Sequence, residues 1–73
     1  MFIRSQTGKY LVETNGLVIE VIGTEVICFY ISNISDSSYI TLGKYMNEED
    51  AMEVVNDIQI ACFDHAVFQM PER

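Results

Sequence analysis

The pattern of hydrophobic residues changes once along this chain, near Asn47, and this change sets the fold class. Before it, short apolar runs are separated by turn residues such as Asn15–Gly16 and Gly23–Thr24, a pattern typical of β-strands joined by tight turns. After it, apolar residues recur at helical spacing. The sequence therefore predicts an α+β fold, in which an antiparallel meander sheet of five or six short strands carries one helix packed on one face.

The chain has 73 residues, which we interpret as a single domain because two halves of this length would each lack a core. Connections as short as these pair successive strands antiparallel. The expected strands cover residues 2–6, 10–14, 17–22, 25–32 and 38–43, the helix covers residues 48–64, and a short last strand covers residues 67–70.

Asn47 is predicted to cap the N-terminus of the helix, and the three acidic residues after it suit the positive end of the helix dipole. Met46 and Ala51 are expected to pack across this cap as a hydrophobic staple. The predicted inward-facing stripe consists of Ala51, Val54, Val55, Ile58, Ala61 and Cys62.

Two of the predicted strands do not alternate between apolar and polar residues. Residues 17–19 and 26–31 are apolar at consecutive positions, so both faces of the sheet centre are expected to be buried. One helix covers only one face of a sheet. Met52, Ile60 and Phe63 also fall on the outer side of the helix. Together these features predict a homodimer or higher oligomer rather than a monomer.

The charge of the chain excludes several classes of partner. Four Lys and Arg residues against eleven Asp and Glu residues give a net charge of -7, which excludes a non-specific nucleic-acid coat protein and argues against docking on anionic lipid. No apolar run approaches the roughly 18 residues that a membrane span needs. Because no secretory signal is visible either, we expect a cytoplasmic protein with reduced, buried cysteines.

Cys62 and His65 are three positions apart near the expected end of the helix. This spacing would suit two metal ligands or a nucleophile with its base. The sequence offers no partner motif for either role, and it has no phosphate-binding loop or nucleophile elbow. We therefore predict no enzyme, metal site or cofactor, and interpret the pair as a buried thiol beside a histidine that suits the negative end of the helix dipole.

The predicted helix carries a row of carboxylates. The simpler interpretation is a solvated helix surface, and the alternative is mimicry of nucleic acid, in which the row binds a basic groove on another protein. The residues that would bind such a partner are Glu49, Glu53 and Asp57.

The few cations include two that lie near tyrosines in the predicted fold. Arg4 is in the first strand, and Lys44 stands beside Tyr45 and close to Tyr39. Together these four residues predict a nucleotide pocket, in which the cations hold phosphate and the rings stack on the base. The alternative interpretation is that the tyrosines pack at a strand edge with their hydroxyls in water.

Five short motifs occur in a familiar order along the chain. They are Ile3-Arg4-Ser5-Gln6, Leu42-Gly43-Lys44-Tyr45, Ala51-Met52-Glu53-Val54-Val55, Ile58-Gln59 and Val67-Phe68-Gln69-Met70-Pro71. In this respect the chain resembles a group of small uncharacterised proteins encoded in phages and prophages of Gram-positive bacteria. The resemblance implies a context in which small accessory proteins inhibit host defence by binding, and it implies no activity or site residue.

These observations support two hypotheses of function. In the first, which we favour, the chain is a non-enzymatic antagonist of host defence that sequesters a nucleotide immune signal at a cleft between subunits. In the second, it is an acidic protein–protein inhibitor that mimics nucleic acid and blocks a host defence enzyme. A structural or regulatory phage protein outside host defence is the third possibility.

Overall fold

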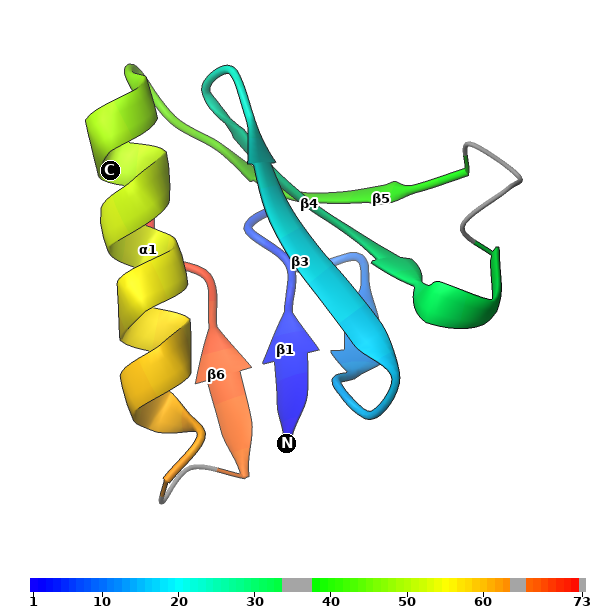
Figure 1. The fold of residues 1–73 in the computed structure, drawn as a ribbon. Helices are drawn as coiled ribbons and strands as arrows, with labels where there is room; N and C mark the ends of the chain where they lie inside the picture. Colours follow the sequence, from blue (N-terminus) through cyan, green and yellow to red (C-terminus); the bar gives the residue numbers. More distant parts are fainter. Residues whose placement is uncertain (34–37, 64–65, 73) are drawn as a thin grey trace.

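A computed structural model describes residues 1–33, 38–63 and 66–72 of the chain. Within these ranges the chain forms two three-stranded β-sheets, one α-helix and a short 3-10 helix (Figure 1). The strands are β1 (Phe2–Arg4), β2 (Leu11–Glu13), β3 (Leu17–Ile22), β4 (Glu25–Tyr30), β5 (Ile40–Lys44) and β6 (Val67–Gln69); the helices are η1 (Ile31–Asn33) and α1 (Glu48–Ala61).

The first sheet, called here the terminal sheet, has the strand order β2-β1-β6 and joins the two ends of the chain. β1 is the central strand, antiparallel to β2 and parallel to β6, so that Ile3 lies opposite both Val12 and Phe68. The last strand was expected near residues 67–70, and it forms there as an edge strand that ends before Pro71.

The second sheet, called here the meander sheet, has the order β3-β4-β5 and is antiparallel throughout. Its register shifts where Val26 lies opposite Gly43 and Ile27 lies opposite Thr41, which leaves Leu42 as an extra residue in β5. The α+β class is therefore confirmed, but the single meander of five or six strands is wrong, because the chain divides its strands between two sheets.

The Asn15–Gly16 turn is the point where the chain passes from one sheet to the other. Leu17 N donates to the Thr14 carbonyl at 3.0 Å, and Gly16 has a φ of 77°, which glycine adopts at little cost. The tight turn is thus present as predicted. It does not form a hairpin, however, because β2 pairs with β1 and β3 pairs with β4.

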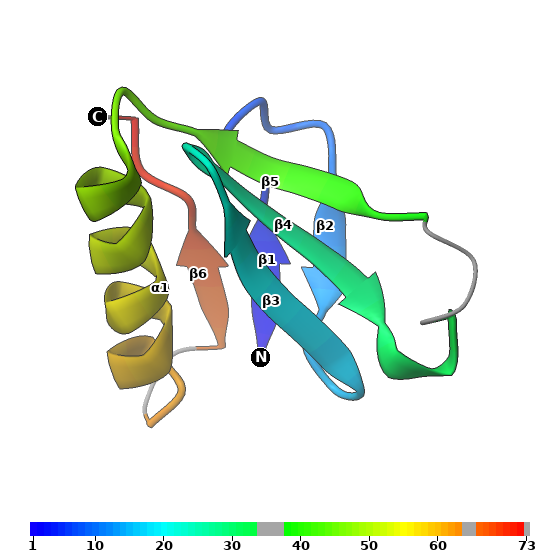
Figure 2. The same ribbon diagram turned by 45° about the horizontal axis from the view of Figure 1, so that its top comes forward.

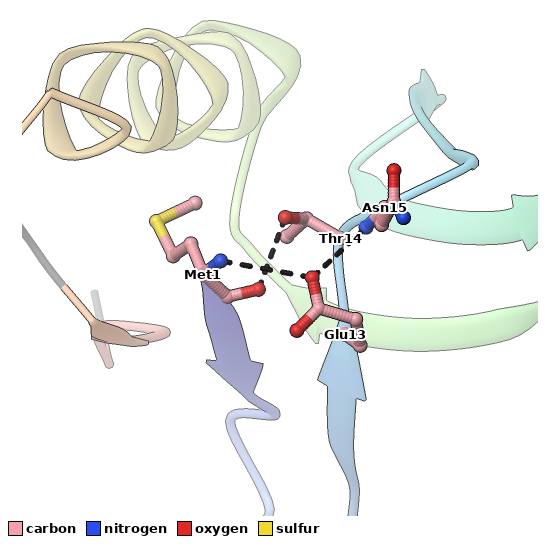
Figure 3. Close-up of polar contacts among 4 residues, drawn as sticks. All are labelled: Met1, Glu13, Thr14 and Asn15. Carbon is pink, nitrogen blue, oxygen red and sulfur yellow. Dashed lines mark hydrogen bonds and ion pairs between the residues drawn. The ribbon is translucent and has the colours of Figure 1, made fainter.

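Polar contacts beside this turn hold the end of β2 against the start of β1 (Figure 3). The backbone N and Oγ1 of Thr14 both donate to the Met1 carbonyl, each at 3.0 Å. Glu13 Oε1 lies 3.6 Å from the Met1 ammonium group and accepts a hydrogen bond from Asn15 N at 3.1 Å. These contacts help to pair β2 with β1 in the terminal sheet. The hydrophobic periodicity of the sequence does not predict them.

The two sheets and the helix share one hydrophobic core. In Figure 2 the meander sheet crosses the terminal sheet, and α1 runs beside both. The helix packs against β3 and β4. The buried residues of this core are Ile3 and Val12 from the terminal sheet, Val26, Cys28 and Leu42 from the meander sheet, Ala51, Val54 and Ile58 from α1, and Tyr45 and Met70 from the connecting segments.

The N-terminus of α1 matches the prediction in part. Asn47 is the cap, and its side-chain oxygen accepts from Asp50 N at 2.8 Å. The expected hydrophobic staple is wrong, because the Met46 side chain is 85% exposed while Ala51 is buried.

The inward face of α1 is rotated slightly from the predicted stripe. Val55 is half-buried and Cys62 is exposed, whereas the helix buries Ala51, Val54, Ile58 and Ala61. The helix ends at Ala61, earlier than expected, because Cys62 is already its C-cap. Asp64 and His65 lie outside the described residues.

The centre of β4 is buried on both faces, as predicted, because Val26, Ile27 and Cys28 are all inaccessible. Val26 and Cys28 face the shared core, so strand alternation places Ile27 on the outer face. Ile27 is only 3% exposed, and it lies opposite Glu20 and Thr41 in the neighbouring strands. Ile27 is therefore buried within the single chain.

Met52 and Ile60 are exposed on the outer side of α1, as predicted, and Phe63 is exposed just beyond the end of the helix. Self-association itself stays a prediction. No helix within the described ranges is long and apolar enough to cross a membrane.

Candidate ligand-binding groove

An open groove of about 480 Å³ lies between the loop that follows β1 and the strand β5. We call it the β5 groove. Its polar and aromatic lining comes from Gln6, Thr7 and Tyr10 on the loop side and from Tyr39, Thr41 and Lys44 on the β5 side.

Ser5 organises the loop that forms one wall of the β5 groove. It is fully buried, and its Oγ accepts from Tyr10 N at 3.1 Å and shares a hydrogen bond with Thr7 Oγ1 at 3.2 Å. Its backbone N donates to the Tyr10 carbonyl at 2.9 Å, and its carbonyl accepts from Gly8 N at 2.9 Å. The Thr7 hydroxyl and the Tyr10 backbone are therefore held in place before any ligand binds, which lowers the entropic cost of ordering this loop.

Gln6 joins this loop to β5 and so connects the two sheets. Its backbone N donates to the Leu42 carbonyl at 2.7 Å, and its Oε1 accepts from Lys44 N at 2.9 Å. Its Nε2 donates to the Pro71 carbonyl at 3.2 Å. The side-chain amide of Gln6 thus extends the hydrogen bonding of β5, and it holds both walls of the β5 groove in register.

Lys44 is the charged residue of the β5 groove. It is the last residue of β5 and is exposed, and none of the described lining residues is a carboxylate. Glu25 lies opposite Lys44 in β4, and its Oε1 accepts a hydrogen bond from Thr41 Oγ1 at 3.2 Å. In a chain of net charge -7, this groove is consequently lined by a cation and neutral groups.

The structure brings together two of the four residues predicted to form a pocket. Tyr39 and Lys44 line the same groove, and the Tyr39 ring is 55% exposed. Arg4 does not line it, because its Nη1 donates to the Gly8 carbonyl at 3.0 Å from the exposed side of β1. Sequence reasoning missed Tyr10, whose position directly after the Gly8–Lys9 turn was the only available signal.

Tyr45 belongs to the core and does not line the β5 groove. It is 7% exposed, and its hydroxyl donates to the Pro71 carbonyl at 2.9 Å. Its ring lies so close to Gly43 that a Cβ atom there would be 2.7 Å from the Tyr45 hydroxyl oxygen. Lys44 and Tyr45 are adjacent in sequence but point to opposite sides of the chain.

The acidic residues predicted to meet a partner protein lie along α1. Glu49 and Glu53 are exposed and Asp57 is half-buried. Their spacing of four residues places them on one side of the helix. The arrangement permits contact with a basic surface.

The two cysteines differ in their surroundings, and both are free thiols. Cys28 is buried as predicted, and burial raises its pKa to about 11, so it is protonated and a poor nucleophile at neutral pH. Cys62 is exposed, which contradicts the prediction of a buried thiol. The proposed pairing of Cys62 with His65 lies outside the described residues. Among the residues that the structure describes, no three His, Cys, Asp or Glu side chains cluster to hold a metal ion.

Comparison of the chain with models of known protein families, with curated proteins and with solved structures finds no match. Any function must therefore be inferred from the chain itself. The groove offers tyrosine rings, hydroxyl groups and one ammonium group, which is a set suited to binding.

Proposed function

We propose that this chain is a non-enzymatic protein that binds a small nucleotide in the β5 groove. The observation that carries the proposal is the convergence of Tyr10, Tyr39 and Lys44 on one groove whose described lining contains no carboxylate. The Lys44 ammonium group would bind phosphate, and the tyrosine rings would stack on the base or the sugar. Thr7 would add a hydroxyl group, and the Thr41 hydroxyl, which donates its proton to Glu25 Oε1, would add an acceptor oxygen.

The net charge of -7 opposes an anionic ligand, and its effect depends on distance. At physiological salt, charges more than about 8 Å apart on the surface are largely screened. A phosphate beside Lys44 would therefore interact mainly with Lys44 itself and with Glu25 on the facing strand. The balance of charges close to Lys44 therefore decides the affinity.

The sequence resembles small proteins encoded in phages, and in that context nucleotide binding would serve to inhibit host defence. By holding a nucleotide immune signal, the chain would lower its free concentration in the cytoplasm of an infected or lysogenic bacterium and so antagonise host defence. A homo-oligomer is part of the proposal, since the β5 groove is open on one side and a second subunit would close it into an inter-subunit cleft.

Ligand retention and equilibrium binding test this function. Mass spectrometry of protein purified from phage-infected cells is expected to show a bound nucleotide, and calorimetry is expected to show weaker nucleotide binding for Lys44→Ala by about 1.5–3 kcal/mol. Lys9→Ala is the matched control, because Lys9 is exposed and lies outside the groove lining. Equal affinities for both variants and the parent would overturn the proposal.

The acidic α1 surface supports a second candidate function, in which the chain blocks the nucleic-acid site of a host protein. The specific observation is that exposed Glu49 and Glu53 stand beside exposed Met52, a mixed surface suited to a basic partner with an apolar patch. Replacing Glu49, Glu53 and Asp57 by Lys would abolish inhibition under this function and would leave nucleotide binding intact under the first.

A further inference from the structure

A second, smaller hollow adjoins the β5 groove. It has a volume of about 140 Å³ and shares Tyr39 and Ile40 with the groove as common walls. Its other walls include Leu17, Cys28 and Tyr30. We call it the Cys28 hollow. The last residue pair between β4 and β5 is Cys28 opposite Ile40, and β4 then continues to Tyr30 without a partner in β5. The Cys28 hollow lies at this end of the pair.

The lining of the Cys28 hollow is mainly apolar. Leu17 and Ile40 contribute aliphatic surface, and the Cys28 thiol is neutral because it is buried in the core. The hydroxyl groups of Ser38 and Tyr30 supply polar atoms among these walls. A flat ring with apolar faces and a hydrogen-bonding edge matches this combination of surfaces.

The size of the Cys28 hollow limits what enters it. An apolar protein cavity of about 150 Å³ takes a benzene ring, so a hollow of about 140 Å³ has room for one six-membered ring. Because the hollow is open on one side, this size favours a single ring between its walls and leaves the second ring of a purine outside them. Ile40 and Lys44 are four residues apart, which corresponds to about 13 Å along a strand. A ring in the hollow would therefore need an extended polar chain to reach the ammonium group.

From these observations we infer that the ligand of the β5 groove is a pyrimidine nucleotide with its base in the Cys28 hollow and its phosphates at Lys44. This inference rests on the proposed function and adds the chemical class of the base. Tyr39, which forms a wall of both spaces, contacts the sugar between the base and the phosphates in this arrangement.

UDP and ADP provide the test, because they share the ribose and both phosphates and differ in the base. Calorimetry with the full chain is expected to give a dissociation constant for UDP at least tenfold lower than for ADP. Ser38→Trp fills the Cys28 hollow from an exposed rim position, and it is expected to weaken UDP binding tenfold or more while leaving ADP binding unchanged. Ser38→Thr is the control, because it keeps the hydroxyl group and adds only a methyl group, and it is expected to match the parent.

The outcomes separate this inference from the proposed function. If neither nucleotide binds, or if Lys44→Ala changes neither affinity, the proposed function fails and the inference fails with it. If both nucleotides bind through Lys44 with equal affinity, and Ser38→Trp changes neither, the pyrimidine assignment alone is overturned.

Discussion

The Tyr45 hydroxyl donates a hydrogen bond to the backbone carbonyl of Pro71 at 2.9 Å, and this contact attaches the C-terminal segment to the end of the meander sheet. The same carbonyl accepts from Gln6 Nε2 at 3.2 Å, so residues from three distant parts of the sequence meet at one oxygen atom. Gln6 also forms hydrogen bonds with the backbone of Leu42 and Lys44 in β5. The Tyr45–Pro71 contact thus supports the wall that carries Lys44.

Gly43→Ala is expected to destabilise the fold through Tyr45. The new Cβ atom would lie 2.7 Å from the Tyr45 hydroxyl oxygen and 3.0 Å from the ring, so the buried ring must shift. Overpacking of this kind costs about 1–3 kcal/mol, measurable by urea denaturation. In the Tyr45→Phe background the cost of Gly43→Ala is expected to be smaller, because the closest atom is gone. An unchanged cost in that background would show that the hydroxyl group of Tyr45 is not the cause.

Val54→Asp is expected to unfold the protein or to cost at least about 3 kcal/mol, because Val54 is fully buried between α1 and the sheets. Val55→Asp is expected to cost clearly less, since Val55 is half-buried. Met52→Asp is the control on the exposed side of the helix, with an expected change of no more than about 0.5 kcal/mol. Thermal unfolding followed by circular dichroism gives all three values, and a larger loss for Val55→Asp than for Val54→Asp would contradict this helix orientation.

Stability is expected to fall at alkaline pH because of Cys28. Burial raises the pKa of its thiol from 9.0 to about 11, so the folded chain holds the proton in a range where the unfolded chain loses it. The contribution of this thiol is present below pH 9 and is lost progressively between pH 9 and 11, by roughly 2–3 kcal/mol. Urea denaturation across this range measures the loss.

The control for this pH dependence is Cys28→Ala, whose stability is expected to decline less between pH 9 and 11 than that of the parent. A thiol reagent gives an independent check: at neutral pH it is expected to modify exposed Cys62 in the folded chain, and to modify Cys28 only after denaturation. Rapid modification of both thiols in the folded protein would contradict the burial of Cys28.

Glu25→Gln is expected to strengthen nucleotide binding. Glu25 lies opposite Lys44 in the β4–β5 pair, so its carboxylate repels a phosphate placed beside the lysine. The substitution keeps an oxygen that can accept from Thr41 Oγ1 while it removes the charge. The expected gain is about 0.2–1 kcal/mol, the range for exposed charge pairs, and it should shrink at high salt. Calorimetry at two salt concentrations measures both effects, and a loss of affinity would place the phosphate elsewhere.

Local sequence patterns predicted most elements of this fold, although η1 (Ile31–Asn33) begins where the strand at 25–32 was expected to continue. The Asn47 cap, the helix that follows it and the strand at 17–22 were all predicted from side-chain periodicity and turn chemistry. Such patterns depend on residues close in sequence. The division into two sheets depends instead on contacts between distant residues, such as Thr14 with Met1 and Gln6 with Leu42. No periodicity in the sequence encodes these pairings.

The candidate site was predicted only in part, for a related reason. Tyr39 directly precedes β5 and Lys44 is its last residue, and both line the groove, so proximity in sequence was a useful signal. Tyr45 turns inward because β5 contains an extra residue at Leu42, and a register shift of this kind is invisible without the partner strand. Tyr10 reaches the groove through the loop that Ser5 organises, which is a consequence of tertiary structure.

Backbone NMR during a nucleotide titration tests the central claim most directly, because it locates the ligand on the chain. With UDP as the probe, we expect the amide signals of Tyr10, Tyr39 and Lys44 to shift in a saturable manner, and those of Glu49 and Glu53 on α1 to stay in place. Shifts confined to α1, or no saturable shift in any groove residue at millimolar UDP, would contradict nucleotide binding in the β5 groove.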